Sequence, residues 1–197
     1  MLKKGKRILF TEGVSNIRTV GAVAPTGRFV ARAMAPEIKK SDPPKIIVEL
    51  GVGTGSITEE IVKHLRPEDR FVGIDSNRAL LEECKKNIET LARDRFVCVE
   101  YADAQELKHM LKEHNITAVD EVICTIPFRA LSAHKTKKIL TQVNDILISG
   151  GRFVFIRYLL APATKEIFQT LHNFTVVKKK IVMSNIPPTE VITMRKG

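Results

Sequence analysis

Short apolar segments alternate with amphipathic ones from residue 45 onward, and this alternation limits the possible folds more than any other feature. Residues 45–50 form a continuous, β-branched apolar run, as in a strand that is buried on both faces. Ile57, Ile61 and Leu65 then recur at helical spacing among polar residues. Buried strands joined by crossover helices form a parallel sheet covered on both sides, so the sequence predicts an α/β, doubly wound fold.

The same alternation continues towards the C-terminus. Further strands are expected at residues 70–75, 95–101, 117–125 and 151–158, and helices at 77–93, 103–114, 135–147 and 163–171. The last two apolar segments, residues 174–183 and 191–195, are joined by a short proline-containing turn with no room for a helix. We therefore expect a mostly parallel, Rossmann-like sheet that ends in an antiparallel strand pair.

A polar stretch punctuated by prolines, residues 36–44, suggests how the chain is organised. Such a composition is typical of a linker, here between an N-terminal helical extension (residues 1–40) and a core domain (residues 41–197). Within the extension, four basic residues interleave with Leu2, Ile8, Leu9 and Phe10. This pattern suits a segment that lies on an anionic membrane surface, although a solvated, frayed terminus is the simpler alternative.

The chain has 32 Lys and Arg against 22 Asp and Glu, which gives a formal net charge of +10. This excess indicates an anionic partner: a nucleic acid, an anionic membrane surface or a phosphorylated substrate. No apolar run approaches the roughly 18 residues that a membrane-spanning helix needs. The cysteines, Cys84, Cys98 and Cys124, lack CxxC spacing and the five histidines show no metal spacing. Neither a disulfide nor a metal site is therefore predicted, and the cysteines are expected to be small buried residues.

The first predicted strand ends in Glu49-Leu-Gly51-Val-Gly53-Thr-Gly55, directly before a helix. Glycines at such a turn adopt positive φ and let a ligand approach the backbone, although a tight turn without a ligand also needs glycine. About twenty residues on, the second strand ends in Asp75, an acid suited to accept hydrogen bonds from both ribose hydroxyls. The acid before the glycines would repel a pyrophosphate and suits a cationic ligand. A nucleoside that carries positive charge is the predicted ligand.

From the glycine motif through Ala102-Asp103-Ala104, the sequence resembles the class I S-adenosylmethionine-dependent methyltransferases. The resemblance implies S-adenosylmethionine as cofactor, with Asp75 holding the ribose and Asp103 reaching the adenine amine. The cofactor-binding set that it implies is Glu49, Gly51, Gly53, Thr54, Gly55, Asp75, Ser76, Asp103, Ala104 and Thr26.

The fourth predicted strand is followed by Cys124-Thr-Ile-Pro-Phe128, where amine methyltransferases carry a polar residue, any residue, a proline and an aromatic. The resemblance implies that Pro127 directs carbonyls at the acceptor nitrogen and that Phe128 holds a developing ammonium by cation–π attraction. Thr125 departs from the usual Asn or Asp. A proline that merely ends a strand is the alternative.

The segment 16–28 resembles the one that precedes the core of bacterial phospholipid N-methyltransferases, which act on phosphatidylethanolamine. Arg157-Tyr158 and the turn at residues 185–188 fit the same family, whereas Thr26 and Gly27 replace its usual two serines. Thr26 is still suited to cap the next helix. The resemblance implies a cytoplasmic protein, peripheral on the inner face of the membrane, whose partners are an anionic membrane surface and the phospholipid substrate. No stable protein partner is expected.

The expected reaction is an in-line displacement in which a neutral amine attacks the sulfonium methyl group. The expected catalytic set is Tyr158, Pro127, Phe128 and Thr125, and Tyr158 is the first candidate for contact with the acceptor. The expected substrate-binding set is Arg18, Arg157 and His134, the two arginines as ligands of a phosphodiester. Because neighbours on a strand point to opposite faces, Arg157 and Tyr158 cannot both face the site in a regular strand.

Three other functions fit the same cofactor motif. One is an RNA adenine N-methyltransferase of the dimethylase kind, which the net charge suits but for which the chain offers few aromatic rings to stack on bases. The others are a small-amine methyltransferase and a cofactor-binding protein that docks on membrane or RNA without catalysis.

Overall fold

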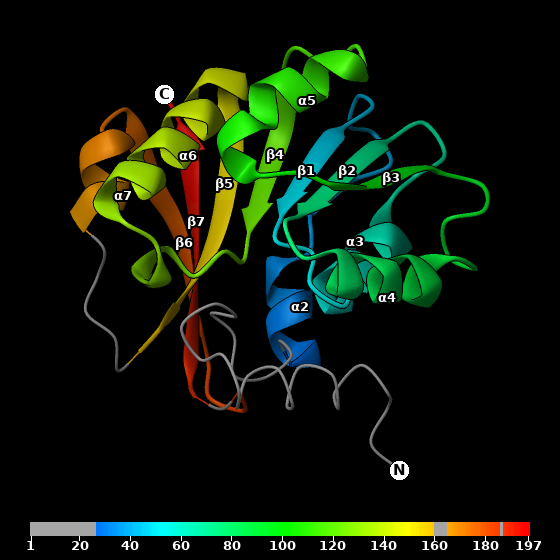
Figure 1. Ribbon diagram of the computed structural model, residues 1–197, viewed down its shortest axis with the longest axis horizontal. Coiled ribbons are helices and arrows are strands. Elements are labelled where there is room, and N and C mark those ends of the chain that lie inside the picture. The colour runs from blue at the N-terminus through cyan, green and yellow to red at the C-terminus, as the bar shows by residue number, and fades with distance from the viewer. Residues whose placement is uncertain (1–26, 160–164, 186) are drawn as a thin grey trace.

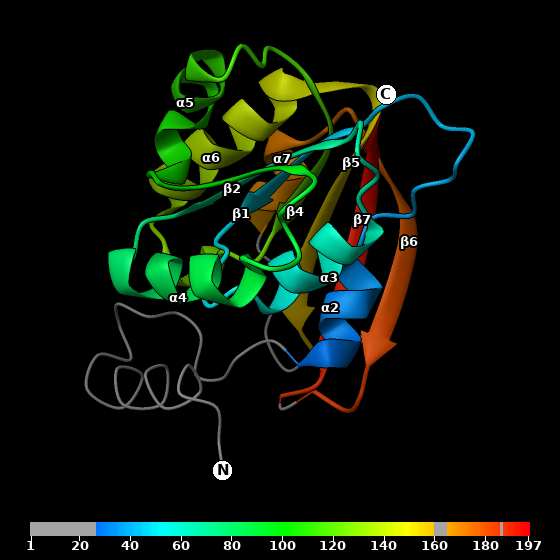
Figure 2. The same ribbon diagram turned by 90° about the vertical axis from the view of Figure 1, so that its right-hand side faces the viewer.

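The computed structural model describes residues 27–159, 165–185 and 187–197 as one seven-stranded sheet with helices on both faces (Figures 1 and 2). The strands are β1 (Ile46–Leu50), β2 (Arg70–Asp75), β3 (Phe96–Tyr101), β4 (Val119–Cys124), β5 (Leu147–Tyr158), β6 (Phe174–Val182) and β7 (Thr189–Lys196). The helices are α2 (Arg28–Met34), α3 (Ser56–His64), α4 (Arg78–Ile88), α5 (Leu107–Glu113), α6 (Ala133–Ile146) and α7 (Lys165–Thr170). Two 3₁₀ turns are η1 (Ala104–Glu106) and η2 (Phe128–Ala130).

The strand order is β3-β2-β1-β4-β5-β7-β6, with β1 to β5 parallel and β7 antiparallel to both of its neighbours. This confirms the doubly wound α/β fold and the antiparallel C-terminal pair. One arrangement goes beyond the prediction, because β7 inserts between β5 and β6. As a result β6 is the outermost strand and runs in the same direction as β5. The C-terminal ends of β1 to β6 therefore all lie on one side of the sheet, its carboxyl edge.

Two apolar layers hold the helices to the sheet. On one face α5, α6 and α7 bury side chains such as Leu111 and Leu140 against Phe153. On the other face α2, α3 and α4 bury Met34 and Ile61 among others. Figure 2 shows these two helical groups on opposite sides of the sheet. The strands are apolar on both faces because each face is covered, as the continuous apolar runs predict.

Helix ends follow local capping more closely than apolar periodicity. The Asn77 side chain accepts hydrogen bonds from the N–H groups of Ala79 and Leu80, so α4 begins at Arg78, one residue after the predicted start, and it ends at Ile88 rather than at residue 93. The helix predicted over residues 103–114 is divided, because the Asp103 side chain caps the short η1 turn before α5 begins.

The described part of the N-terminal extension belongs to the core. Val30, Ala31 and Met34 of α2 are buried in the same cluster as α3 and α4. The N-cap position of α2 falls on Gly27 rather than on Thr26, and the N–H of Gly27 donates to Oδ1 of Asn185 at 3.2 Å. Residues 1–26, which include the expected membrane-docking segment, Arg18 and Thr26, lie outside the described residues.

The predicted linker is held in place by one arginine. The Arg66 guanidinium donates to the carbonyls of Lys39, Asp42 and Pro43 at 2.7–3.2 Å, and to the buried carboxylate of Asp69 at 2.7 Å. The polar, proline-rich segment is therefore anchored to the start of β2. Among the residues that the structure describes, no helix is both long and apolar enough to cross a membrane.

Candidate active site

The glycine motif forms the turn between β1 and α3 at the carboxyl edge of the sheet. Gly51, Gly53 and Gly55 all have positive φ, at 85°, 54° and 89°, as the motif predicts. A Cβ on Gly55 would lie 2.9 Å from Sγ of Cys84, so this glycine also lets α4 pack closely beneath the turn. A Cβ on Gly53 would meet nothing within 4 Å, which leaves the backbone there open to a ligand.

Glu49 lies beneath this turn and is fully buried. Its Oε2 accepts a hydrogen bond from Oγ1 of Thr58 at 2.7 Å, whereas its Oε1 has no partner in the described part of the chain. The pKa of Glu49 is raised to about 8, chiefly by burial; the hydrogen bond from Thr58 opposes this shift, and the negative charge of Asp75 adds to it. A cationic donor at Oε1 would satisfy the free oxygen and favour the ionised carboxylate. The ammonium of S-adenosylmethionine is such a donor, so the buried acid fits this cofactor.

Asp75 ends β2 beside the glycine turn. Its Oδ2 accepts from the N–H of Gly53 and its Oδ1 from the N–H of Asn77, both at 2.8 Å. Burial raises the pKa of Asp75, although the backbone N–H groups that it accepts from oppose the shift. Each oxygen has further lone-pair capacity. The carboxylate is therefore oriented by the backbone and can still receive two ribose hydroxyls.

The other expected cofactor residues are spread along the same edge. Asp103 is exposed, and both of its oxygens accept from Gln105, at 2.9 Å and 3.0 Å. Ser76 is exposed as well, and the carbonyl of Thr54 accepts from Nδ2 of Asn87 at 2.9 Å. The Ala104 side chain is buried in the core, and its contact with the cofactor stays a prediction.

Residues that the sequence analysis missed also shape this edge. Thr58 of α3 donates a hydrogen bond to Glu49, and Cys84 of α4 packs against Gly55. In the sequence, only helical periodicity indicated that these two side chains face the glycine turn. Tyr101 is level with Asp75 in the strand register and exposes half of its side chain, with the Arg78 guanidinium 4.1 Å from its ring centroid. In the sequence, only the position of Tyr101 directly before Ala102-Asp103 indicated that it lies near the cofactor site.

The segment after β4 supports the glycine turn more than it faces an acceptor. The Thr125 hydroxyl donates to the carbonyl oxygen of Gly51, and the carbonyl oxygen of Leu50 is 3.3 Å away. Its hydrogen bond is therefore made within the glycine turn rather than to an amine. Pro127 precedes the η2 turn as its N-cap. The Phe128 ring is only 6% exposed and packs in the core under α6, so the expected cation–π contact lacks an open ring face.

Of the predicted substrate-binding residues, the structure describes Arg157 and His134, and no described contact joins them. The Arg157 guanidinium donates from Nε to Oε2 of Glu190 at 2.9 Å, so its positive charge is already paired within the sheet. His134 is exposed in the first turn of α6, and no described contact links it to the glycine turn. Tyr158 is half-buried, and burial raises the pKa of its phenol. It lies three residues past Phe155, which is level with Cys124, so it stands about 10 Å beyond the end of β4.

This fold, with a buried acid, a glycine turn and an aspartate at the ends of neighbouring strands, defines a class I S-adenosylmethionine-dependent methyltransferase. Residues 48–153, more than half of the chain, match the family model described as "Methyltransferase domain". The chain belongs to this family.

Curated relatives with similar sequences act on different acceptors. The ubiquinone/menaquinone biosynthesis C-methyltransferase of Wigglesworthia glossinidia brevipalpis is 28% identical over 131 residues, which cover 66% of this chain and 48% of that protein. The chain thus spans about half the length of this relative. The ornithine lipid N-methyltransferase of Singulisphaera acidiphila is 23% identical over 134 residues, which cover 68% of each chain.

Solved structures show the same fold. Magnesium protoporphyrin IX methyltransferase of Synechocystis PCC 6803, crystallised with S-adenosylmethionine, matches with a TM-score of 0.67 at 11% identity over 98% of each chain. At this identity the likeness establishes the fold alone.

Proposed function

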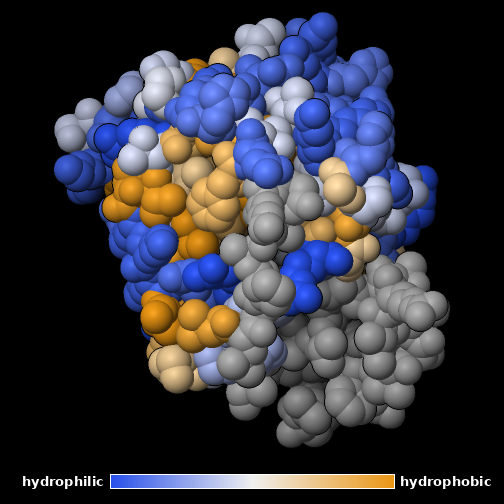
Figure 3. All heavy atoms as spheres, turned by 90° about the vertical axis from the view of Figure 1, so that its left-hand side faces the viewer, coloured by the Kyte–Doolittle hydropathy of each residue, from blue (hydrophilic) through white to orange (hydrophobic). Residues whose placement is uncertain are grey.

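We propose that this methyltransferase methylates the amine of phosphatidylethanolamine at the surface of an anionic membrane. The observation that carries the proposal is a surface of β6 on which exposed apolar side chains lie beside lysines. We call it the β6 surface and define it by Lys178, Lys179, Lys180, Ile181 and Met183, of which Lys179 and Ile181 share one face of this edge strand, Lys178 and Lys180 share the other, and Met183 follows its last residue. Figure 3 shows apolar residues among hydrophilic ones on the face that carries α7 and β6. Ile181 is 54% exposed and Met183 is 69% exposed, a costly arrangement for side chains that never leave water.

The β6 surface adjoins the candidate acceptor residue. Val182 pairs with Thr189 of β7, and Thr189 pairs in turn with Tyr158 at the end of β5. Ile181 precedes Val182, so its side chain points to the opposite face of the sheet from Val182 and Tyr158, and Met183 follows the last residue of β6 at the carboxyl edge, roughly 10 Å from the end of β5. A membrane that contacts these apolar side chains would therefore lie at the carboxyl edge, and a lipid amine would pass around that edge to reach Tyr158.

The energies suit reversible membrane contact. Burying Ile181 and Met183 in the interface would contribute about 1.5–3 kcal/mol each at full burial, and each lysine near anionic headgroups contributes about 1 kcal/mol. Lys178 pairs with Glu37, which reduces its share. A total of several kcal/mol gives a peripheral protein that binds and leaves, as an enzyme that must turn over a lipid requires.

The chain's own groups suit transfer to an amine. Bound at Glu49 and Asp75, S-adenosylmethionine supplies an electrophilic methyl group on its sulfonium. Because burial raises the pKa of Tyr158, its phenol stays protonated at neutral pH and can hydrogen-bond the acceptor without carrying a charge. The half-buried setting also disfavours the ammonium form of an incoming amine, so its proton passes to solvent before the nitrogen attacks. The similarity to an ornithine lipid N-methyltransferase supports an amine-bearing lipid as acceptor.

An RNA acceptor is the second candidate. A ribosomal RNA small subunit methyltransferase H of Dictyoglomus thermophilum is 28% identical over 94 residues, which cover 48% of this chain and 31% of that protein. The net charge of +10 suits RNA as well as an anionic membrane.

The test is methyl transfer from labelled S-adenosylmethionine, with the full chain, to phosphatidylethanolamine vesicles that contain an anionic lipid. Ribosomal RNA and a panel of small amines are run beside them. We expect label in the lipid alone. Label in RNA or in a small amine would overturn the proposed acceptor while leaving the cofactor site intact.

A pair of variants tests the β6 surface. Ile181→Glu combined with Met183→Glu should lower transfer to vesicles at least tenfold and leave cofactor affinity unchanged. The matched control is Ile148→Glu, because Ile148 is 41% exposed at the opposite end of β5. Equal transfer by all three proteins would remove the β6 surface from lipid contact.

A further inference from the structure

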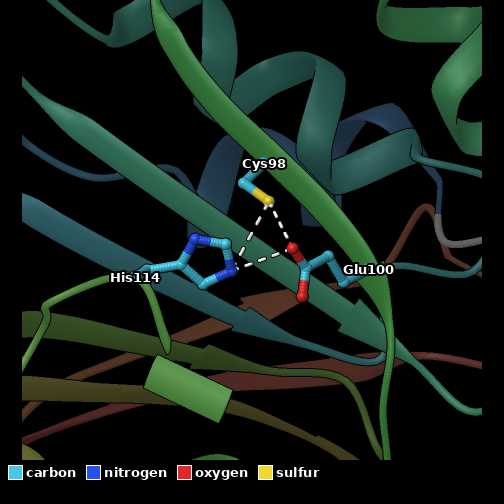
Figure 4. A group of neighbouring side chains, drawn as sticks. All are labelled: Cys98, Glu100 and His114. Atoms are coloured by element: carbon cyan, nitrogen blue, oxygen red, sulfur yellow. Dashed lines mark hydrogen bonds and ion pairs between the residues drawn. The ribbon is translucent and has the colours of Figure 1, made fainter. Parts of the chain in front are cut away.

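Three side chains with metal-binding atoms converge on the edge strand β3, outside the cofactor site. Cys98 and Glu100 are alternate residues of β3 and so share one face, and His114 follows the last turn of α5. Figure 4 shows all three pointing towards one another. Sγ of Cys98 lies 3.0 Å from Oε1 of Glu100 and 3.9 Å from Nε2 of His114, and the last two atoms are 2.8 Å apart.

We propose that Cys98, Glu100 and His114 bind a zinc ion. A thiolate, an imidazole and a carboxylate are the donors that Zn²⁺ takes in proteins. Bond lengths of about 2.0–2.3 Å in a tetrahedron require ligand-to-ligand distances of roughly 3.3–3.6 Å. The three observed distances bracket this range, so side-chain shifts of about half an ångström make room for the ion.

Charge and access agree with such a site. A Cys98 thiolate and a Glu100 carboxylate together offset the two positive charges of Zn²⁺, and the thiol proton passes to the buffer as the ion binds. All three residues are half-buried, so an ion can enter from solvent and keep a water as its fourth ligand. No other hydrogen-bond partner engages the three donor atoms in the described part of the chain.

The site would connect two elements that flank a cofactor residue. Cys98 and His114 are 16 positions apart, and Asp103 lies between them. A bound ion would fix the end of α5 to the edge strand and would limit local opening of the segment that carries Asp103. We therefore expect zinc to raise the thermal stability of the protein.

The experiment is a titration of the metal-free full chain with Co²⁺, which reports tetrahedral and thiolate ligation by its visible and near-ultraviolet bands, followed by displacement with Zn²⁺. We expect one equivalent and a sulfur-to-cobalt charge-transfer band. Cys98→Ser should abolish that band, and His114→Ala should weaken binding at least tenfold. His109→Ala is the matched control, because His109 forms another histidine–glutamate pair on α5, with Glu113 at 3.8 Å and no thiol.

A second measurement requires no variant. Zn²⁺ should protect Cys98 from alkylation as read by mass spectrometry, while the buried Cys84 and Cys124 stay unmodified with or without the ion. Absence of the cobalt bands, retention of the band in Cys98→Ser, or alkylation of Cys98 at the same rate with Zn²⁺ would each overturn the proposal. In that case Glu100 and His114 form an ion pair to which the Cys98 thiol is hydrogen-bonded, and no metal ion is bound.

Discussion

The buried carboxyl of Glu49 provides the sharpest test of the site, through the substitution Glu49→Gln. In the cofactor-free protein the pKa of Glu49 is about 8, against an ordinary value of 4.5, chiefly because the group is buried. The unfolded chain releases this proton above about pH 4.5, whereas the native state keeps it until about pH 8. The native state thus binds more protons within that window, and the free energy of unfolding falls as pH rises through it.

The magnitude follows from the difference in pKa. A shift of 3.5 units, from 4.5 to about 8, corresponds to roughly 5 kcal/mol of lost stability across the whole window. Gln has nearly the same shape and does not titrate, so the variant lacks this loss. We expect the stability of Glu49→Gln relative to the natural protein to grow by about 1.4 kcal/mol per pH unit between pH 5 and 8, and then to level off.

The assay is urea unfolding of both cofactor-free proteins at pH values from 5 to 8.5. All other titrating groups are common to the two proteins, so the difference curve isolates Glu49. A flat difference curve would refute the reasoning, because it would mean that the carboxyl titrates alike in both states. Calorimetry in buffers of different ionisation enthalpy adds a second readout. Near pH 7, cofactor binding should release a proton from Glu49 in most molecules of the natural protein and none from this position in the variant.

Three further predictions concern packing and binding. Gly55→Ala should destabilise the protein by about 1–3 kcal/mol more than Gly150→Ala in thermal or urea unfolding, since both glycines have positive φ but only Gly55 lacks room for a Cβ; equal losses would contradict this. Arg66→Ala should lower the free energy of unfolding, because it removes the guanidinium beside the Asp69 carboxylate and the hydrogen bonds to the carbonyls of residues 39–43; unchanged stability in urea unfolding would argue against the anchor. Asp75→Ala should weaken cofactor binding at least tenfold in calorimetry, and unchanged affinity would exclude its ribose role.

Much of the fold was predictable from the sequence because its signals are local. The continuous apolar runs at residues 45–50 and 70–75 correspond to β1 and β2, since strands covered on both faces need apolar residues throughout. The glycines at 51, 53 and 55 have positive φ as the motif predicts, because only glycine adopts that conformation without strain. The Asn77 cap and its helix follow from the same kind of short-range chemistry.

Side-chain partners were less predictable, because they depend on segments far apart in the chain. Arg157 looked like a phosphate ligand, yet β7 inserts beside β5 and brings Glu190 level with it. Phe128 fitted an acceptor motif, but its ring is buried in the same apolar cluster as residues of α6. A strand neighbour is chosen by the packing of the whole sheet, and no pattern within a few residues encodes that choice.

The sequence by itself thus determined the succession of strands and helices along the chain and the glycine turn, since each depends on backbone preference and apolar periodicity over fewer than twenty residues, while the class of cofactor came from the resemblance of the segment 49–104 to a methyltransferase family. Only the tertiary structure decided the free oxygen of Glu49, the apolar β6 surface and the meeting of Cys98, Glu100 and His114. These features exist because packing brings distant groups within about 3 Å of one another or leaves them without a partner, and burial then changes the energy of every charge among them.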